Sequence, residues 1–355
     1  MSKALSDSKP LCSRKMKITP KEVERYSRML ALHDFKKSDM ESVKGIRVAV
    51  VGAGGLGSPA LRLLTAIGFG VIRIVDRDVV ELSNIQRQTI YNTQDVGKPK
   101  ADVAAENLAL LNPHVNFEPL CISIEESNAN DILKGCDIIV DGLDSFHSRR
   151  AVNKASQSLG IPYVFAGAVE YYANLTTFVP GETGCFSCIM GNVEDNPENS
   201  CEKIGVTPTL LSIVAAIEVR EAVLLAIKKE ARLKNRLMTV DISSLSFDFF
   251  EIARAENCPV CSVNRVDDIT SQEGPIATAL CSGTFNVSPI KILNLDLKSI
   301  AALLAKKHKV ASQEKFLAIE TGSGVKVTLS ATGTATIKGV ETPEKALSVY
   351  QDILQ

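Results

Sequence analysis

The sequence lacks the features that mark several classes of protein. Its 355 residues include no Trp and only 5% aromatic side chains, and 40 basic side chains nearly balance 41 acidic ones. A chain with a formal net charge of −1 and so few rings lacks the basic footprint and the stacking surface typical of nucleic-acid binding. These totals are compatible with a local basic cluster, but we expect no nucleic-acid partner.

Signals for secretion and for membrane insertion are also missing. The first 20 residues are polar and basic and lack an apolar core segment. The most apolar stretch, 210–227, contains Glu218, Arg220 and Glu221, so it predicts a buried helix rather than a membrane span. We expect a cytoplasmic protein without a membrane partner. Nine cysteines, an odd number, do not suit a complete disulfide framework and favour metal binding or catalysis.

The first half of the chain alternates between strand and helix patterns. Residues 1–19 resemble a flexible tail, and Pro20 opens a helix. Short β-branched runs are expected to be buried strands, at 46–51, 71–75, 138–140 and 163–165. Helical patterns lie between them, at 57–68, 98–111 and 147–160. Such alternation predicts a parallel α/β sheet.

The rhythm changes after residue 170. We expect a strand at 172–179, a long loop at 181–206, a helix at 208–229 and strands near 238–242 and 246–252. A linker is expected at 263–283, where Asp, Ser, Gly and Thr dominate. The last segment, 284–355, predicts a small α+β unit, with strands at 285–293, 315–320, 324–330 and 334–338 and helices at 297–307 and 343–354. Its role is unassigned, and a small docking or regulatory module is our hypothesis.

A glycine-rich loop points to a nucleotide. Residues 52–57 read Gly-Ala-Gly-Gly-Leu-Gly, follow a strong strand pattern and precede a helix, while Asp76 ends the next strand. Glycines let the backbone approach phosphates, the helix N-terminus favours negative charge, and the carboxylate accepts ribose hydroxyls. The motif does not distinguish NAD, FAD and ATP. The alternative interpretation is a tight turn that binds no ligand.

Charged residues after the second strand favour ATP. Arg87 and Lys100 lie in the stretch 76–100, at the expected carboxyl end of the sheet. Attack on phosphorus needs fixed cations around the phosphate oxygens, whereas hydride transfer needs few. A solvated loop is the alternative. Asp144 ends another strand on the same rim, where it could bind Mg²⁺ or cap the following helix.

The cysteines divide into pairs and single residues. Cys185 with Cys188 and Cys258 with Cys261 form two C-x-x-C pairs, which predict a closed tetrahedral zinc site that joins distant segments; redox pairs are the alternative. Cys201 lies in a polar loop ahead of a helix, as a nucleophile would, although it could equally be an incidental surface thiol. Cys121 and Cys136 are expected in the core.

In their order and spacing, these pieces resemble the ubiquitin-activating-enzyme-like ThiF/MoeB/HesA family. The resemblance covers residues 20–262 and rests on both cysteine pairs and on the stretches 25–28, 52–59, 76–78, 83–88, 96–100, 141–145 and 201–208. It implies a Rossmann-like, doubly wound α/β sheet with a zinc-clipped second half, to which 284–355 adds a small α+β appendage. It further implies an ATP-dependent adenylyltransferase that uses Mg²⁺ and activates the C-terminal glycine of a ubiquitin-like or sulfur-carrier protein ending in Gly-Gly.

The resemblance also assigns residues. Asp76 would take the ribose, Asn84, Arg87 and Lys100 would contact the phosphates, and Asp144 would bind Mg²⁺. The full set of expected nucleotide contacts is Gly52, Gly54, Gly55, Gly57, Asp76, Asp78, Ser83, Asn84, Ile85, Gln86, Arg87, Lys100, Asp144 and Ser145. The expected catalytic residues are Arg28, Arg87, Lys100 and Cys201.

Two of these residues imply partners. Arg28 resembles an arginine that enters the ATP site of a partner subunit, which implies a homodimer. Cys201 resembles the cysteine that forms a thioester, persulfide or acyl disulfide with the activated protein, and a sulfurtransferase or conjugating enzyme could act next. A tRNA-base dehydratase of the same family, an NAD-dependent oxidoreductase and a scaffold without activity are the competing hypotheses. The segment 284–355 does not clearly resemble a rhodanese or a ubiquitin-fold domain.

Overall fold

The computed structural model describes residues 15–191, 193, 195, 201–262, 274–280, 284–289, 291–313 and 315–354. The expected flexible tail at 1–19 therefore lies mostly outside the described residues, as do Cys12 and Cys281. Thr19 is described, and its side chain caps the first helix by accepting a hydrogen bond from the backbone N–H of Glu22.

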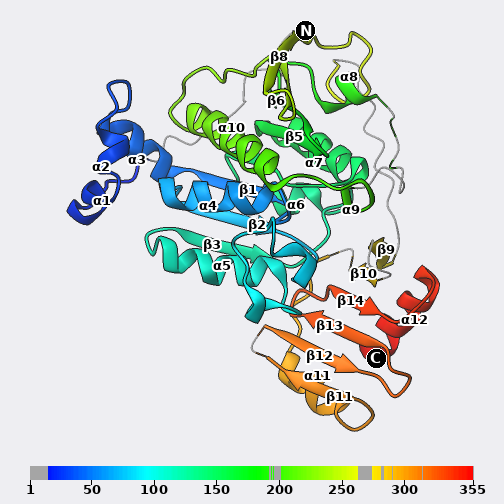
Figure 1. Ribbon diagram of the computed structural model, residues 1–355. Helices are drawn as coiled ribbons and strands as arrows, with labels where there is room; N and C mark the ends of the chain where they lie inside the picture. Colours follow the sequence, from blue (N-terminus) through cyan, green and yellow to red (C-terminus); the bar gives the residue numbers. More distant parts are fainter. Residues whose placement is uncertain are drawn as a thin grey trace, which may run out of the picture.

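An eight-stranded sheet forms the first unit (Figure 1). Its strands are β1 (Arg47–Val51), β2 (Val71–Val75), β3 (Asn116–Leu120), β4 (Ile138–Asp141), β5 (Tyr163–Val169), β6 (Tyr172–Phe178), β7 (Arg236–Asp241) and β8 (Ser246–Glu251). The order is β3-β2-β1-β4-β5-β6-β7-β8, parallel as far as β5 and antiparallel beyond it. The strand order reverses between β1 and β4, which is where doubly wound sheets bind ligands.

Helices cover both faces of this sheet. One face carries α4 (Gly57–Ile67), α5 (Lys100–Leu111) and α10 (Pro208–Ala226). The other carries α6 (Ala129–Leu133), α7 (Phe146–Leu159) and α8 (Phe186–Met190). The remaining helices of this unit are α1 (Pro20–Arg25), α2 (Ser27–Leu30), α3 (Lys37–Gly45), α9 (Cys201–Ile204) and the 3₁₀ turns Leu82–Asn84 and Thr93–Asp95.

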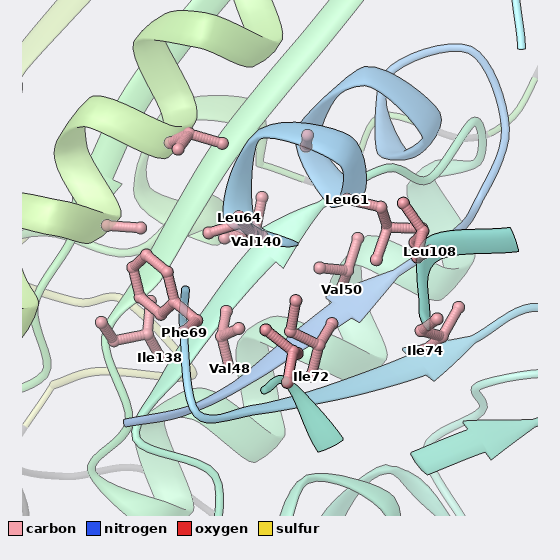
Figure 2. Close-up of a cluster of buried hydrophobic side chains, with 14 of the residues drawn as sticks. Val48, Val50, Leu61, Leu64, Phe69, Ile72, Ile74, Leu108, Ile138 and Val140 are labelled. Carbon is pink, nitrogen blue, oxygen red and sulfur yellow. The ribbon is translucent and has the colours of Figure 1, made fainter. Parts of the chain in front are cut away.

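Strand β1 explains why the sheet needs two helical layers. Val48 and Val50 join a core with α4, β2 and α5, which Figure 2 shows around Leu61, Leu64 and Phe69. Ala49 and Val51, which point the other way, join the core beneath α7. The strand is buried on both faces from Val48 to Val51, so this part of its sequence is uniformly apolar rather than alternating. The predicted Rossmann-like, doubly wound fold is confirmed.

A second, antiparallel sheet forms a C-terminal unit, which we define as residues 274–354. Its strands are β9 (Ile276–Leu280), β10 (Thr284–Ser288), β11 (Lys309–Ser312), β12 (Phe316–Glu320), β13 (Lys326–Ser330) and β14 (Ala335–Lys338), in the order β11-β12-β13-β14-β10-β9. Helices α11 (Leu297–Leu304) and α12 (Pro343–Leu354) pack against it. Figure 1 places this sheet below the first one, beside β3 and α5.

Several elements differ from the sequence expectations. The expected linker 263–283 contains β9, which pairs with β10, because the composition of the whole stretch hides one short strand. Strand β3 was missed because Glu118 and Pro119 interrupt its apolar pattern; proline is tolerated there because β3 lies at the edge of the sheet. Strand β11 was missed too. The expected loop 181–206 contains the short helices α8 and α9.

The apolar helix α10 is buried inside the protein. Its Glu221 accepts hydrogen bonds from the Thr177 hydroxyl at 2.8 Å and from the backbone N–H groups of Arg232 and Leu233 at 2.9 Å each. A carboxylate satisfied in this way is stable away from water. Among the described helices, none is long and apolar enough to cross a membrane.

Candidate active site

A cavity lies at the carboxyl ends of β1, β2 and β4, at the point where the strand order reverses. Nine of the residues expected from the sequence line it: Gly52, Gly54, Gly55, Asp76, Asp78, Asn84, Arg87, Lys100 and Asp144. Six others that are described do not line it: Arg28, Gly57, Ser83, Ile85, Gln86 and Ser145. The pattern of the sequence thus located the rim, although it did not separate lining residues from their neighbours.

The glycines of the loop fall into two groups. Gly52 has φ +93°, and a Cβ there would lie 2.3 Å from the carbonyl oxygen of Gly142. A Cβ on Gly57 would lie 1.8 Å from the carbonyl oxygen of Gly52. These two are required for the turn itself. A Cβ on Gly54 would meet nothing closer than 3.8 Å, so the loop presents an open backbone surface to the cavity there. Such a surface lets phosphate oxygens approach the backbone.

Asp76 lies at the end of β2 with both carboxylate oxygens held by the backbone. One accepts the N–H of Ala53 and the other the N–H of Asp78, each at 2.7 Å. Burial raises the pKa of Asp76 to about 6, against the opposing charge of Lys100. The side chain is therefore fixed beside the glycine loop, where a ribose hydroxyl would be recognised.

Lys100 is a buried cation at the first position of α5. Its Nζ lies 3.1 Å from Oδ2 of Asp78. Burial lowers the pKa of Lys100, but the charges of Asp78 and Asp76 outweigh it and hold the pKa above its usual value. The ammonium group is therefore charged and fixed at neutral pH, as a site that stabilises developing negative charge requires.

Arg87 supplies a second cation across the loop. Its Nη1 donates to the carbonyl oxygen of Ser83 at 3.0 Å, and its Nε would lie 3.8 Å from a Cβ on Gly55. Beside it, Asn84 accepts the N–H of Glu81 at 3.0 Å and closes a 3₁₀ turn. The turn 82–84 therefore aims Arg87 over the glycine loop.

The end of β4 supplies acidic residues with different roles. Asp141 is fully buried and accepts hydrogen bonds from Nε of Arg149 at 3.1 Å, from the N–H of Leu143 at 2.8 Å and, over a short contact, from the Tyr163 hydroxyl. Asp144 lies exposed on the rim of the cavity, where a metal could reach it. Ser145 instead caps α7 by accepting the N–H of Ser148 at 3.2 Å.

Sequence reasoning missed part of the cavity. Arg77, Gln88, Ser123 and Arg149 line it but were not singled out. Ser123 follows β3, the strand that was not predicted, so no sequence signal placed it on the rim. Arg77 and Gln88 directly follow chosen residues. Arg149 lies in the predicted helix 147–160, and only its ion pair with the buried Asp141 distinguishes it from other helical charges.

The segment that contains Cys201 returns to the cavity. Cys201 begins α9, and its side chain lies outside what the structure describes. Four residues on, the carbonyl oxygen of Gly205 accepts the N–H of Glu170 at 2.8 Å, and Val206 pairs with Glu170 and lines the cavity. The chain around Cys201 is thus anchored to the end of β5, beside the cavity.

The four paired cysteines come together as one cluster. Their Sγ atoms all lie within 4.8 Å of one another, with neighbouring separations of 3.9, 3.6 and 3.4 Å. A tetrahedral ZnS₄ centre with ~2.3 Å bonds needs sulfurs ~3.8 Å apart, so the donor set suits zinc. The N–H of Ala255 points to Sγ of Cys188 at 3.4 Å and the Asn153 amide to Sγ of Cys185 at 3.5 Å, which supports bound thiolates. The cluster joins α8 to the segment after β8.

Comparison with known proteins decides the family. Residues 26–260 match the model of the ThiF family. This chain belongs to the ThiF family. It is an ATP-dependent adenylyltransferase, as its similarity to several adenylyltransferases indicates.

Two curated relatives and one solved structure define the similarity. The SAMP-activating enzyme E1 of Haloferax volcanii is 35% identical over 249 residues, which cover 70% of this chain and 92% of that protein. The sulfur carrier protein ThiS adenylyltransferase of Bacillus subtilis is 28% identical over 337 residues, 92% of this chain and 98% of that protein. The crystal structure of Escherichia coli MccB has a TM-score of 0.60 and 25% identity over 68% of this chain and 73% of that one.

The cavity suits the nucleotide that this chemistry requires. Asp78 and Gln88 line it, and Oδ1 of Asp78 and Oε1 of Gln88 are buried without a hydrogen-bond partner among the described residues; the nearest charge to Oδ1 is Nε of Arg77, at 3.8 Å. Buried polar atoms of this kind are normally satisfied by a ligand or by water. Together with the open surface at Gly54, they leave room and hydrogen-bonding capacity for ATP.

Proposed function

We propose that this ThiF-family enzyme adenylates the C-terminal glycine of a ubiquitin-like or sulfur-carrier protein. The observation that carries the proposal is the pair of fixed cations, Lys100 and Arg87, beside an open glycine loop. The Haloferax relative is a SAMP-activating enzyme and the Bacillus relative is a ThiS adenylyltransferase, which supports this class of substrate.

Each residue of the site would have a separate role in adenylation. An oxygen of the carrier carboxylate attacks the α-phosphorus of ATP and forms a new P–O bond. The bond from the α-phosphorus to pyrophosphate breaks, and pyrophosphate leaves. Negative charge builds on the phosphate oxygens, and Lys100 and Arg87 would stabilise it from fixed positions. Asp76 would hold the ribose, and Asp144 would bind Mg²⁺, which offsets charge on the phosphates.

Transfer through Cys201 would be the second step. The thiolate attacks the carbonyl carbon of the acyl adenylate, a thioester forms and AMP leaves; if Cys201 bears a persulfide, the product is an acyl disulfide. The anchoring of 205–207 beside the cavity supports this role for the segment. A sulfurtransferase or a conjugating enzyme would then accept the product.

One experiment tests both steps with Bacillus subtilis ThiS as the probe. We expect ThiS to support ATP–pyrophosphate exchange and to form an adduct that peptide mass spectrometry assigns to Cys201. Cys201→Ala should keep exchange and lose the adduct, because only the second step needs the thiol. Cys136→Ala, which alters a buried unpaired cysteine, is the matched control and should keep both.

The outcomes separate the steps. ThiS without its last glycine should support no exchange, and equal exchange with that form would refute the proposed substrate chemistry. An adduct that persists in Cys201→Ala would remove Cys201 from the mechanism. A phosphine reductant should release an acyl disulfide but leave a thioester intact, which identifies the sulfur chemistry.

A homodimer would complete the site. Arg28 does not line the cavity of its own chain; it lies on α2 at a largely apolar groove formed with α4 and α10, where Leu63 and Val219 also lie. Leu32 at this groove is 53% exposed. We propose that a second copy of the chain covers this groove, so that Arg28 reaches the partner's phosphates.

Complementation between two inactive variants tests this arrangement. Arg28→Ala and Lys100→Ala should each lose exchange as homodimers. In a mixed dimer, one site combines Lys100 of one chain with Arg28 of the other, so a co-expressed 1:1 mixture should recover about a quarter of wild-type exchange. If Arg28 acted within its own chain, no mixed site would be intact and the mixture would stay as inactive as either parent.

A further inference from the structure

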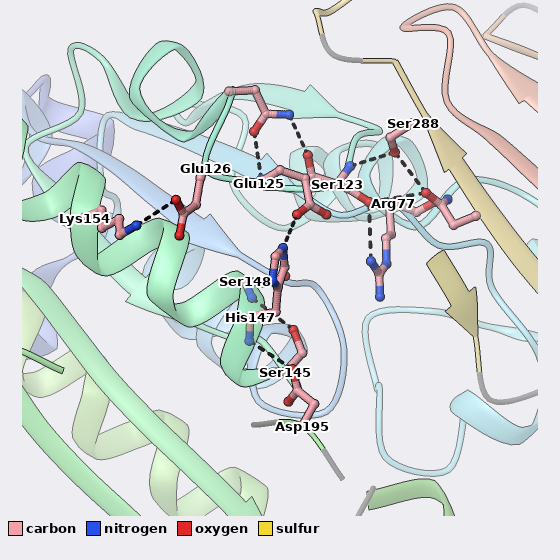
Figure 3. Close-up of polar contacts among 12 residues, drawn as sticks. Arg77, Ser123, Glu125, Glu126, Ser145, His147, Ser148, Lys154, Asp195 and Ser288 are labelled. Atoms are coloured by element: carbon pink, nitrogen blue, oxygen red, sulfur yellow. Dashed lines mark hydrogen bonds and ion pairs between the residues drawn. The ribbon is translucent and has the colours of Figure 1, made fainter. Parts of the chain in front are cut away.

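The C-terminal unit touches the wall of the nucleotide cavity. Figure 3 shows Ser288 of strand β10 next to Ser123 and Arg77, both of which line the cavity. Around this contact, Thr332 of the C-terminal unit donates to the carbonyl oxygen of Cys121 at 2.6 Å, and Lys315 lies 2.9 Å from Glu106 of α5. The unit therefore docks on the segment after β3.

Strand β10 is built for this contact. Phe285 and Val287 enter the core of the C-terminal unit, while the alternate residues Thr284, Asn286 and Ser288 are polar and buried. A buried polar face needs hydrogen-bond partners, and Asn286, which is completely buried, finds them in the first unit.

Asn286 joins the ends of two neighbouring strands. Its Nδ2 donates to the carbonyl oxygen of Arg77 at 3.0 Å, just after β2. Its Oδ1 accepts the hydroxyl of Ser123 at 3.3 Å, just after β3, and that of Ser288 at 2.9 Å. Ser288 Oγ also accepts the N–H of Ser123 at 3.3 Å. Because the Arg77 carbonyl can only accept, the orientation of the amide is fixed and each donor in this set has an acceptor.

This connection lies beyond the point where strands β2 and β3 pair with each other in the sheet. The pairing of β2 with β3 ends at Val75 and Leu120. Beyond it, residues 76–78 and 122–124 form two adjoining parts of the cavity wall, with Asp76 between Arg77 and the end of β2. Nη1 of Arg77 donates to Oγ of Ser123 across this gap at 3.4 Å, and Asn286 adds a second connection through the Arg77 carbonyl and the Ser123 hydroxyl.

We propose that the C-terminal unit positions the ATP site, with Asn286 as the positioning residue. It fixes the spacing between the wall that holds Asp76 and the wall formed by 122–124, so that the cavity is already shaped for the nucleoside end of ATP. Among the described residues, Asn286 makes no hydrogen bond to Lys100 or Arg87, which would act on the phosphates. Asn286 would therefore act on nucleotide binding rather than on the reacting centre.

The comparisons agree with a tuning role. The Haloferax relative matches over 92% of its length within 249 residues, so its unmatched remainder is far shorter than the C-terminal unit. The Bacillus relative matches over 92% of this chain, an alignment that must extend into this unit. The family fold thus exists with and without such a unit.

Steady-state exchange with Asn286→Ala and Asn286→Asp tests the proposal, which rests on the assignment of the cavity to ATP. Both variants remove the donor to the Arg77 carbonyl, and we expect the KM for ATP to rise about tenfold, with kcat within about twofold of wild type. Binding of a non-hydrolysable ATP analogue, measured by calorimetry, should weaken by the same factor. Lys315→Ala is the matched control, because it alters a peripheral contact between the same units and should leave KM unchanged.

The split between KM and kcat separates positioning from stability. A variant that is merely less stable contains less active enzyme, which lowers the apparent kcat and leaves KM unchanged. Unchanged KM in folded Asn286→Ala, or an equal rise in Lys315→Ala, would overturn the role of Asn286. If the wild-type protein itself fails to bind the analogue, the assignment of the cavity to ATP is wrong.

Discussion

Lys100→Ala is expected to lower ATP–pyrophosphate exchange by about 10²–10³-fold. The ammonium group is buried, charged and held 3.1 Å from Asp78, so it needs no rearrangement when charge develops on the phosphates. Alanine removes a contact that is strongest in the transition state. Exchange measured at saturating ATP and carrier, on protein whose circular dichroism matches wild type, checks this result.

Two further variants make the test decisive. Lys98→Ala removes a half-exposed lysine two residues away that pairs with Asp95 at 3.4 Å and does not line the cavity, and it should leave exchange unchanged. Because Lys100→Ala leaves Asp78 with only the longer ion pair to Arg77, at 3.8 Å, and could weaken the fold, Arg87→Ala provides an independent check. Arg87 makes a hydrogen bond to the Ser83 carbonyl and should lose exchange by a similar factor. Exchange at the wild-type rate in folded Lys100→Ala and Arg87→Ala would remove both from the catalytic site.

The sequence predicted the doubly wound sheet because each signal was local and strong. Apart from Arg47 and Arg73, the runs 46–51 and 71–75 are apolar without alternation, which suits strands buried on both faces, and the glycine loop follows the first of them. Cysteine spacing predicted the cluster across more than 70 residues, because four thiols have few other uses in such a pattern. These signals depend on neighbouring residues or on residue type, which a sequence states directly.

What the sequence could not predict depends on contacts between distant segments. Arg149 is a helical charge like many others until Asp141 is found 3.1 Å away in the core. Asn286 lies 163 positions from Ser123, and no pattern near either residue indicates their hydrogen bond. Ser145 matched the expected nucleotide contacts, yet its hydroxyl caps α7. Spacing located the rim of the cavity, but the three-dimensional partners decide the role of each side chain.

Loss of the four-cysteine cluster is expected to have the largest effect on stability. If the cluster binds zinc, the purified protein should contain about one zinc per chain by metal analysis. Structural zinc contributes roughly 10 kcal/mol or more in small peptide systems, which is comparable to the whole unfolding free energy of a domain. Cys188→Ser, or treatment with a strong chelator, should therefore release the metal and cause a large fall in the unfolding temperature.

The position of the cluster predicts which property changes first. It fastens the segment after β8 to α8, and no cluster cysteine lines the nucleotide cavity. All four thiols can act as ligands, so the zinc would have no open position for substrate and would be structural. At a temperature where Cys188→Ser remains folded, exchange should therefore persist even though zinc is absent. Cys136→Ala, which changes a cysteine outside the cluster, should keep both the metal and the unfolding temperature close to wild type; a metal-free wild-type protein with unchanged stability would rule out the zinc assignment.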